Sequence, residues 1–312
     1  MSAATRPVGL VYKRGADLLR DDTNHYNYGG RRYPSVTSVL GQLSDFMWVH
    51  RSAIANLVNE LAAKLDDGEI HERWTLVEGE GYLKCPCDPR ECLRDGEYIA
   101  NEGLRYVKRA ADRGSALHDL LADYASGLRL SPDDCAEYIG QNIITHGRSC
   151  DAEEVAPYAV SLVRWLESVR PDIWYSEMPV FCDNYEYAGT CDLVLWIGDT
   201  PYLVDLKSST SFRRSWAAQV AAYAHAGFGV VDREHRIEVE MPRVEGRPLM
   251  GGVLMVSPDR AGLRTFATEP YFRKLFIPAL QAWRANATMA LPERNEWHKW
   301  EVPNGCTQSV DR

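Results

Sequence analysis

Two extended, apolar stretches separated by a short turn occupy the middle of the chain, between Gly189 and Lys207. The intervening Gly198-Asp199 pair suits a two-residue hairpin, because a type II′ turn needs glycine at its first central position. Ile197 then faces Thr200, and the numbers of every directly opposed pair sum to 397. The segment therefore predicts two adjacent antiparallel strands with a defined register.

This register brings acidic side chains together. Asp192 lies opposite Asp205, with Cβ atoms about 5 Å apart on one face of the ladder. Lys207 shares that face because side chains two residues apart point the same way, and Leu206 between them leaves its backbone carbonyl free at the strand end. A four-residue loop would place Asp192 opposite Lys207 and keep the three polar groups together. Only an odd loop without a bulge would separate them.

Two carboxylates at this distance repel each other unless a cation or a proton lies between them. A hard divalent ion with oxygen ligands, Mg²⁺ or Mn²⁺, meets that need, and a lysine beside it can orient or deprotonate a water molecule. The alternative is that both aspartates are solvated on an open sheet face. Leu193 and Val204 on one face and Leu203 on the other argue against it, because strands that are apolar on both faces are covered on both sides. We therefore expect a metal site here.

The periodicity of apolar residues predicts an α-β-β-β-α-β order around this hairpin. Its elements are expected at Val155–Val169, Trp174–Cys182, Tyr185–Ile197, Thr200–Lys207, about Phe212–Phe228, and Gly252–Val256. An earlier helix is expected at Leu104–Tyr124 and a last one at about Tyr271–Arg284. We assign residues 104–287 to this α/β core and residues 288–312 to a tail.

Residues 1–103 are expected to form a mostly helical N-terminal extension. A hairpin turns at Gly29-Gly30, Ser35 caps a helix that runs through Leu40, and a second helix covers Val49–Leu65. The stretch Asp66–Asn101 is rich in Gly, Pro, Asp and Glu, which predicts a long loop or insertion.

Composition narrows the class of protein. The chain has 312 residues, of which 45% are hydrophobic and 25% charged, as in globular proteins. Its net charge of −9 repels phosphate at long range, so any nucleic-acid site must be local. Because it shows neither a membrane-spanning run nor a signal peptide, we expect a cytoplasmic protein without membrane contact. Its cysteines should be reduced thiols, and the Cys85/Cys87/Cys92 group a surface loop rather than a metal site.

Two helices carry pairs of residues spaced by four. Gly114 and His118 share one face of the Leu104–Tyr124 helix, where the glycine lets a metal, a strand or DNA approach closely. Gln219 and Tyr223 are adjacent on the helix after Lys207, where an amide and a phenol can hold a phosphate or base, or orient the lysine. A structural histidine, a rim glutamine and a core tyrosine are the simpler interpretations.

Together these segments form motifs. G-x-x-D at Gly189–Asp192, followed by V-D-L-K at Val204–Lys207, resembles the PD-(D/E)XK nuclease superfamily. R-G-S-A-L-H at Arg113–His118 and A-A-Q-V-A-A-Y at Ala217–Tyr223 narrow the resemblance to its RecB-like exonuclease branch, which includes phage and CRISPR-associated members. P-S-V-T-S-V-L at Pro34–Leu40 also looks phage-like.

The resemblance implies a restriction-endonuclease-like α/β core with a Mg²⁺- or Mn²⁺-dependent deoxyribonuclease site. The implied metal ligands are His118, Asp192, Asp205 and the Leu206 carbonyl. The implied catalytic residues are Asp192, Asp205, Lys207, Gln219 and Tyr223. Glu177 and Gly114 would support the site, and the alternatives for Glu177 are a carboxylate on the DNA side or a metal ligand. Phosphate contacts are expected from Arg109, Arg113, Arg213 and Arg214, although a solvated helix face is the alternative for each.

Two accessory groups of such enzymes are not expected. The iron–sulfur cluster of some branch members needs three cysteines after the core, and only Cys306 follows it. No Walker A sequence G-x-x-x-x-G-K-[ST] occurs, so we expect no fused nucleotide motor.

The branch favours an exonuclease that acts on single-stranded or duplex DNA ends in recombination, replication or DNA degradation, in the host cytoplasm if the protein is phage-encoded. A recombination or replication protein is the expected partner. Three alternatives use the same core: a non-catalytic, nuclease-derived DNA-binding adaptor, a structure-specific or restriction-type endonuclease, and an RNase. The intact site residues argue against the adaptor.

Overall fold

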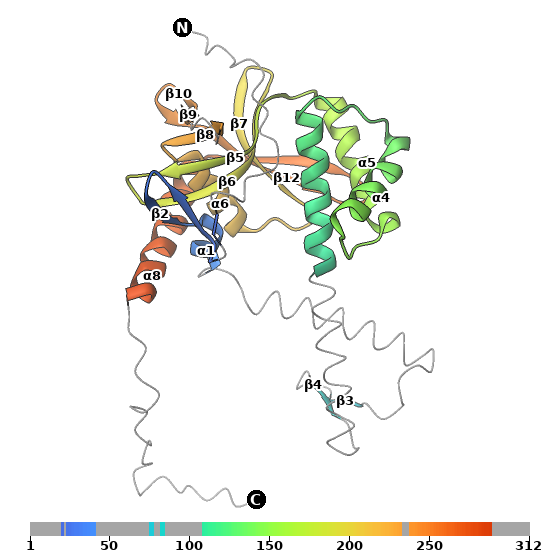
Figure 1. Cartoon of the computed structure of the whole chain (residues 1–312), viewed down its shortest axis with the longest axis horizontal. Helices are drawn as coiled ribbons and strands as arrows, with labels where there is room; N and C mark the ends of the chain where they lie inside the picture. Colours follow the sequence, from blue (N-terminus) through green and yellow to red (C-terminus); the bar gives the residue numbers. More distant parts are fainter. Residues whose placement is uncertain are drawn as a thin grey trace, which may run out of the picture.

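The computed structural model describes residues 20–21, 23–41, 75–77, 82–84, 108–232 and 237–288. At its centre is a seven-stranded mixed sheet with helices on both faces (Figure 1). The strands follow the order β13-β12-β7-β6-β5-β8-β9, in which β12 and β7 are parallel and the other neighbours antiparallel. Their bounds are Asp172–Cys182 (β5), Tyr187–Ile197 (β6), Thr200–Lys207 (β7), Phe228–Asp232 (β8), Ile237–Glu240 (β9), Met250–Val256 (β12) and Ala261–Phe266 (β13). The chain is thus a mixed α/β protein.

The three consecutive strands β5, β6 and β7 confirm the prediction from the apolar runs. The β6–β7 ladder pairs Ile197 with Thr200 and continues to Leu193 opposite Val204, so the predicted register is confirmed. Gly198 has φ of 58°, the positive value that the turn requires and that glycine adopts without steric cost. A local turn signal therefore fixed the alignment of the two central strands.

The helices form two layers, each with its own hydrophobic core. One layer contains the helix at residues 108–125, η3 (Pro132–Asp134), α4 (Cys135–His146) and α5 (Ala152–Val169). The other contains α1 (Val36–Leu40), α6 (Arg214–Ala224), α7 (Thr268–Tyr271), η4 (Phe272–Phe276) and α8 (Ile277–Thr288). Leu193, Val204 and Leu206 face the first core, whereas Val194 and Leu203 face the second. The central strands are covered on both faces, as their apolar sequence indicates.

Several elements differ from the sequence prediction. The helix expected to reach Phe228 ends at Ala224, because Gly227 donates its N–H to the Phe181 carbonyl at 2.8 Å and Phe228 pairs with Phe181 as the start of β8. The last helix begins three residues earlier than expected, at Thr268, and includes the π-helical turn η4. Helix α4 and strands β8, β9 and β13 were not predicted. The small hairpin of β10 (Arg243–Val244) and β11 (Arg247–Pro248) was not predicted either.

The N-terminal hairpin is confirmed and packs on the sheet. Strands β1 (His25–Tyr28) and β2 (Arg31–Pro34) pair antiparallel, and the Ser35 side chain caps α1 by accepting the Ser38 N–H at 3.1 Å. Tyr26 and Tyr33 pack around buried Phe181. Within the expected long loop, β3 (Thr75–Val77) and β4 (Tyr82–Lys84) pair as a short hairpin.

Some predictions lie outside the described residues: the Val49–Leu65 helix, the Cys85/Cys87/Cys92 group, the boundary at residues 103 and 104, and the tail. In the part of the chain that the structure describes, no helix is both long and apolar enough to cross a bilayer.

Candidate metal centre

Three neighbouring strands each contribute one carboxylate to a row across the sheet. The β5–β6 pairs on either side place Glu177 opposite Asp192, and the β6–β7 register places Asp192 opposite Asp205. Asp205 is completely buried and Asp192 is only 7% exposed. Because buried carboxylates repel one another and lose hydration, this row needs a compensating cation or protons.

His118 approaches this row from the helix at residues 108–125. Its Nδ1 lies 3.4 Å from Glu177 Oε1 and 3.6 Å from Asp192 Oδ2. The ligand atoms of these three residues all lie within 4.8 Å of one another. Leu117, Leu120 and their neighbours bury the opposite side of the helix in the first core, which fixes the imidazole over the strands. One imidazole and two carboxylates are thus close enough to share a divalent ion.

Asp205 and Lys207 form the second part of the site. Asp205 Oδ2 lies 2.8 Å from Lys207 Nζ. Asp205 Oδ1 is buried and has no hydrogen-bond partner among the described residues. An unpaired buried carboxylate oxygen is costly, so this atom has a free coordination position for a cation.

The Asp192 carboxylate also holds the end of β7. Its Oδ2 accepts the Leu206 N–H at 2.6 Å, just past the last β6–β7 backbone pair at Leu193 and Val204. Leu206 therefore reaches the site through its amide, while its side chain packs in the first core. The ligand role of its carbonyl stays a prediction.

The charges of the cluster change its proton affinities. Burial lowers the pKa of His118, but Asp192 and Glu177 outweigh this effect and raise the pKa to about 9. Burial raises the pKa of Asp205 to about 6, although Lys207 opposes this shift. Burial also raises the pKa of Asp192, against the attraction of His118. Burial lowers the pKa of Lys207, but Asp205 and Asp192 raise it above its usual value. The cluster therefore binds protons where no ion neutralises it.

Gln219 and Tyr223 lie beside the cluster on α6. Gln219 Nε2 donates to the Tyr223 hydroxyl at 3.1 Å. Tyr223 is buried, and burial together with the neighbouring Tyr26 and Asp205 raises its pKa well above the usual value, so its hydroxyl stays protonated. A Cβ atom at Gly189 would lie 2.3 Å from Tyr223 Cε1. The glycine that opens the G-x-x-D motif thus makes room for the tyrosine ring.

The structure uses the predicted phosphate-binding arginines in different ways. Arg113 Nη1 lies 2.7 Å from Glu154 Oε1, and Arg109 Nη2 lies 3.1 Å from Asp151 Oδ2. These ion pairs fasten the helix at residues 108–125 to α5. Arg213 precedes α6 with its guanidinium 5.2 Å from the centre of the Trp216 ring, and Arg214 is exposed.

Glu177 is more central than the sequence indicated. A supporting or DNA-side role is the first expectation from the sequence and a ligand role the alternative, and the structure places its carboxylate in the close group with His118 and Asp192. Glu177 also has φ of 52°, in the left-handed region that non-glycine residues adopt at a cost of about 1–3 kcal/mol. Such strain is common at functional sites. The sequence of β5 alone could not have revealed this position, because it depends on the register that places Glu177 opposite Asp192. Gly114 lies beside the end of β7, since a Cβ atom there would be 3.9 Å from Ser208 Oγ.

Comparisons with known proteins add little to this description. A scan against protein-family models gave no match, and neither did a search of the curated proteins. Among solved structures, one described as "Crystal structure of SSO0001" matches with a TM-score of 0.22 and 13% sequence identity, covering 54% of this chain and 85% of that one. A likeness this distant carries no argument about function.

Proposed function

We propose that this protein is a Mg²⁺- or Mn²⁺-dependent deoxyribonuclease of the PD-(D/E)XK type that degrades DNA from its ends. The observation that carries the proposal is the convergence of His118, Glu177 and Asp192 within 4.8 Å, beside the buried Asp205–Lys207 pair. Histidine and carboxylate atoms held this close suit a divalent ion, and the free Asp205 oxygen fits the same purpose.

In this proposal His118, Glu177, Asp192 and Asp205 hold the ion. A divalent ion held there polarises a phosphate and makes a bound water more acidic. The Leu206 amide keeps Asp192 in place, because its hydrogen bond fixes one carboxylate oxygen at the end of β7. Two core layers and a backbone hydrogen bond thus orient the ligands before the substrate arrives.

Lys207 and Tyr223 have separate roles. The raised pKa of Lys207 keeps Nζ charged, so it donates hydrogen bonds to a water molecule or a phosphate oxygen rather than removing a proton. The Tyr223 hydroxyl accepts from Gln219, which leaves its own proton for a phosphate or a water in the site. A charged Lys207 and a neutral Tyr223 hydroxyl beside a phosphodiester would stabilise the negative charge that develops on it during hydrolysis.

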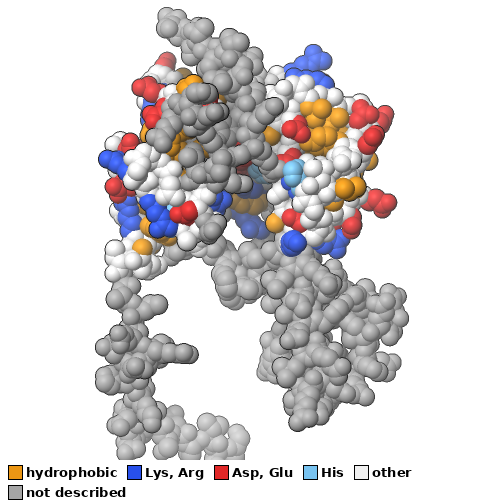
Figure 2. All heavy atoms as spheres, in the orientation of Figure 1, with side chains coloured by type: hydrophobic (Ala, Val, Ile, Leu, Met, Phe, Trp, Pro, Cys, Tyr) orange, Lys and Arg blue, Asp and Glu red, His pale blue; other side chains and the backbone are white. Residues whose placement is uncertain are grey.

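The preference for DNA ends, and the expected recombination or replication partner, rest on the motif resemblance. In the face that Figure 2 shows, acidic and basic side chains are interspersed over the described residues rather than forming one large basic area, which fits a local binding region. In this proposal the strand contacts are concentrated near His118, Asp192 and the end of β7, where the candidate ligands converge.

A digestion assay tests the proposal. End-labelled single-stranded, linear duplex and covalently closed circular DNA are incubated with the full chain in Mg²⁺, Mn²⁺ or EDTA. We expect degradation of the linear substrates with either ion and none with EDTA. Asp192→Asn should reduce the rate at least about a hundredfold, the loss that follows removal of a key electrostatic group.

Asp199→Asn is the matched control, because Asp199 lies in the exposed turn at the far end of the same hairpin. It should retain the full rate. Degradation by Asp192→Asn at the rate of the control would refute the nuclease assignment, and uncut DNA with both ions would favour the binding adaptor. Equal cutting of closed circles and linear DNA would favour an endonuclease.

A further inference from the structure

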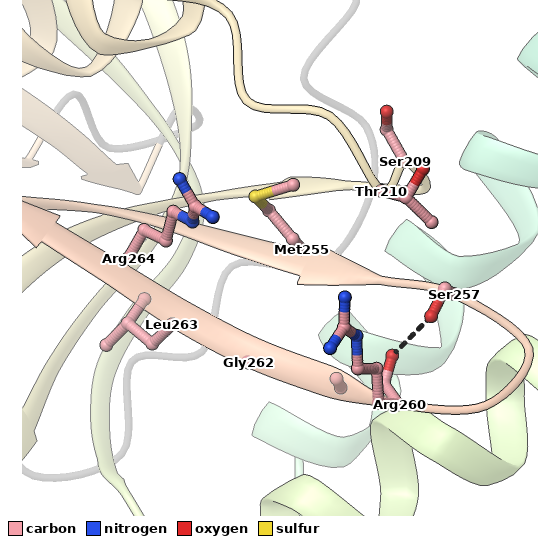
Figure 3. Close-up of a pocket in the computed structure, with 9 residues that line it drawn as sticks. Ser209, Thr210, Met255, Ser257, Arg260, Gly262, Leu263 and Arg264 are labelled. Carbon is pink, nitrogen blue, oxygen red and sulfur yellow. Dashed lines mark hydrogen bonds between the residues drawn. The ribbon is translucent and has the colours of Figure 1, made fainter.

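A pocket of about 250 Å³ lies between the loop after β7 and the β12–β13 hairpin (Figure 3). Two arginines, Arg260 and Arg264, extend along it, and Thr210 and Ser209 lie across from them. No acidic residue is among the described residues that line it. The lining of this pocket therefore carries positive charge, although the chain as a whole has a net charge of −9.

The sequence at the start of β13 creates this pocket. Arg260 directly precedes the strand, and Gly262 and Arg264 lie two and four residues further on, so the glycine leaves a gap between the two long side chains. A Cβ atom at Gly262 would meet nothing within 4 Å. The space between the arginines is therefore open, and a larger side chain at this position would occupy it.

Both guanidinium groups are available to a ligand. Arg260 and Arg264 are exposed, and within the described ranges neither forms an ion pair. The Arg264 guanidinium lies 5.9 Å from the centre of the Phe212 ring, which supports one of its faces. The nearby carboxylate of Asp259 is engaged by the Ser257 hydroxyl at 2.6 Å. Arginine presents paired N–H donors that match two oxygens of a phosphate.

The pocket adjoins the candidate metal centre. Met255 at its floor pairs with Lys207 in the β12–β7 ladder and with Gly262 in the β12–β13 ladder. Paired residues point to the same face, so Lys207, Met255 and Gly262 form one row across three strands. Because neighbouring strands lie about 4.8 Å apart, the glycine is about 10 Å from the lysine. A single nucleic-acid strand can span this distance.

We propose that Arg260 and Arg264 bind a backbone phosphate of a nucleic-acid strand that also reaches the candidate metal centre with another of its phosphodiesters. The choice of nucleic acid as the source of the phosphate rests on the proposed nuclease function. The pocket would set how far the strand extends beyond Lys207, over the parallel pair β7 and β12, and thus fix its path across the sheet.

Binding without hydrolysis tests this inference. The anisotropy of a short, fluorescein-labelled single-stranded oligonucleotide is measured with the full chain in EDTA. Arg260→Gln and Arg264→Gln should each weaken binding about threefold to tenfold, and each should reduce the slope of log K against log salt by about 0.7. Arg247→Gln is the matched control, because Arg247 is an exposed arginine of the small β10–β11 hairpin and makes the same change in charge.

A second pair of variants tests the hollow without changing the charge. Gly262→Leu should weaken binding by a similar factor because its side chain fills the space between the arginines, whereas Gly262→Ala should bind nearly as the wild type does. Circular dichroism and thermal unfolding establish that these variants fold.

The inference is overturned if the oligonucleotide affinities of Arg260→Gln, Arg264→Gln and Gly262→Leu all equal the affinity of the control Arg247→Gln. Inorganic phosphate is tested in the same way. If the arginine variants lose binding of inorganic phosphate but bind the oligonucleotide as the wild type does, the assignment of the pocket to nucleic acid is overturned. These outcomes are independent of hydrolysis: weakened binding by the variants supports the pocket even where the wild type leaves DNA uncut with Mg²⁺ and Mn²⁺, a result that would refute only the nuclease.

Discussion

Replacing Gly189 by alanine should destabilise the protein, because the added methyl group has no room. Its Cβ atom would lie 2.3 Å from Tyr223 Cε1 and 3.2 Å from both Cδ1 and Cζ. The ring cannot move aside easily, since Tyr223 is 2% exposed between the sheet and α6 and accepts a hydrogen bond from Gln219. Overpacking of this kind costs about 1–3 kcal/mol. We expect the free energy of unfolding to fall by that amount.

The same substitution at Gly114 provides the control and should have the opposite sign. Gly114 lies within the helix at residues 108–125, and the nearest atom to an added Cβ is Ser208 Oγ at 3.9 Å, an ordinary contact. Alanine in place of glycine inside a helix stabilises by about 0.5–1 kcal/mol. The two variants, both in predicted motifs, should therefore differ by about 1.5–4 kcal/mol.

Urea unfolding followed by circular dichroism measures both changes, with the slope against urea concentration serving to detect a change in the unfolded state. Tyr223→Ala removes the ring, so Gly189→Ala in that background should cost at least about 1 kcal/mol less than it does alone. An equal cost in both backgrounds would show that the clash with the ring is not the cause. A neutral Gly189→Ala would refute the reasoning altogether.

Four further predictions concern the candidate metal centre and the arginines near it. An imidazole binds a metal ion only when it is neutral, and the carboxylates around His118 raise its pKa to about 9. If His118 is a ligand as proposed, Mn²⁺ affinity measured by calorimetry should weaken about tenfold for each pH unit below 9, and a constant affinity would contradict this. His118→Ala should weaken Mn²⁺ binding more than Mg²⁺ binding, since Mg²⁺ favours oxygen ligands; equal losses would argue against an imidazole ligand. Without divalent ions, the raised pKa of His118 stabilises the fold fully below pH 6.5, and this contribution is lost as the pH rises through about 9. The free energy of unfolding of the wild type, measured with urea, should therefore decline over this pH range, and that of His118→Ala should not. Arg113→Ala should lower the free energy of unfolding by about 1.5–3 kcal/mol, because the Arg113 side chain is 15% exposed and paired with Glu154. Arg214 is exposed, so Arg214→Ala should change this free energy by less than about 0.5 kcal/mol. Similar values for both variants would contradict the ion-pair assignment.

The parts of the fold that depend on local rules could be predicted from the sequence. The Gly198-Asp199 turn fixes the β6–β7 register, and Ser35 begins α1, because each acts on backbone within a few residues. Strand β8 escaped prediction because only residues 225–227 separate it from α6, so its apolar residues extend the apolar run of that helix. Only pairing with β5, nearly fifty residues earlier in the chain, makes this segment a strand.

The candidate site shows the same division. Asp192, Asp205 and Lys207 were placed together by counting along one hairpin. Arg113 forms an ion pair with Glu154 of α5 instead of lying free for a phosphate. This pairing depends on how two helices pack together, which no local sequence pattern encodes. Glu177 required both the β5–β6 register and a left-handed backbone, and neither can be read from a single strand.

The insertion of β12 beside β7 has a consequence for synthesis of the protein. Strand β7 carries Asp205 and Lys207, but one of its edges stays open until residues 250–256 have left the ribosome and paired with it. A nascent chain that ends before this point contains His118 and all three carboxylates, yet lacks the strand that holds two of the charged groups in position. The last fifth of the chain thus completes a candidate centre whose charged side chains are all encoded earlier, so the arrangement proposed for them forms only with the full sheet.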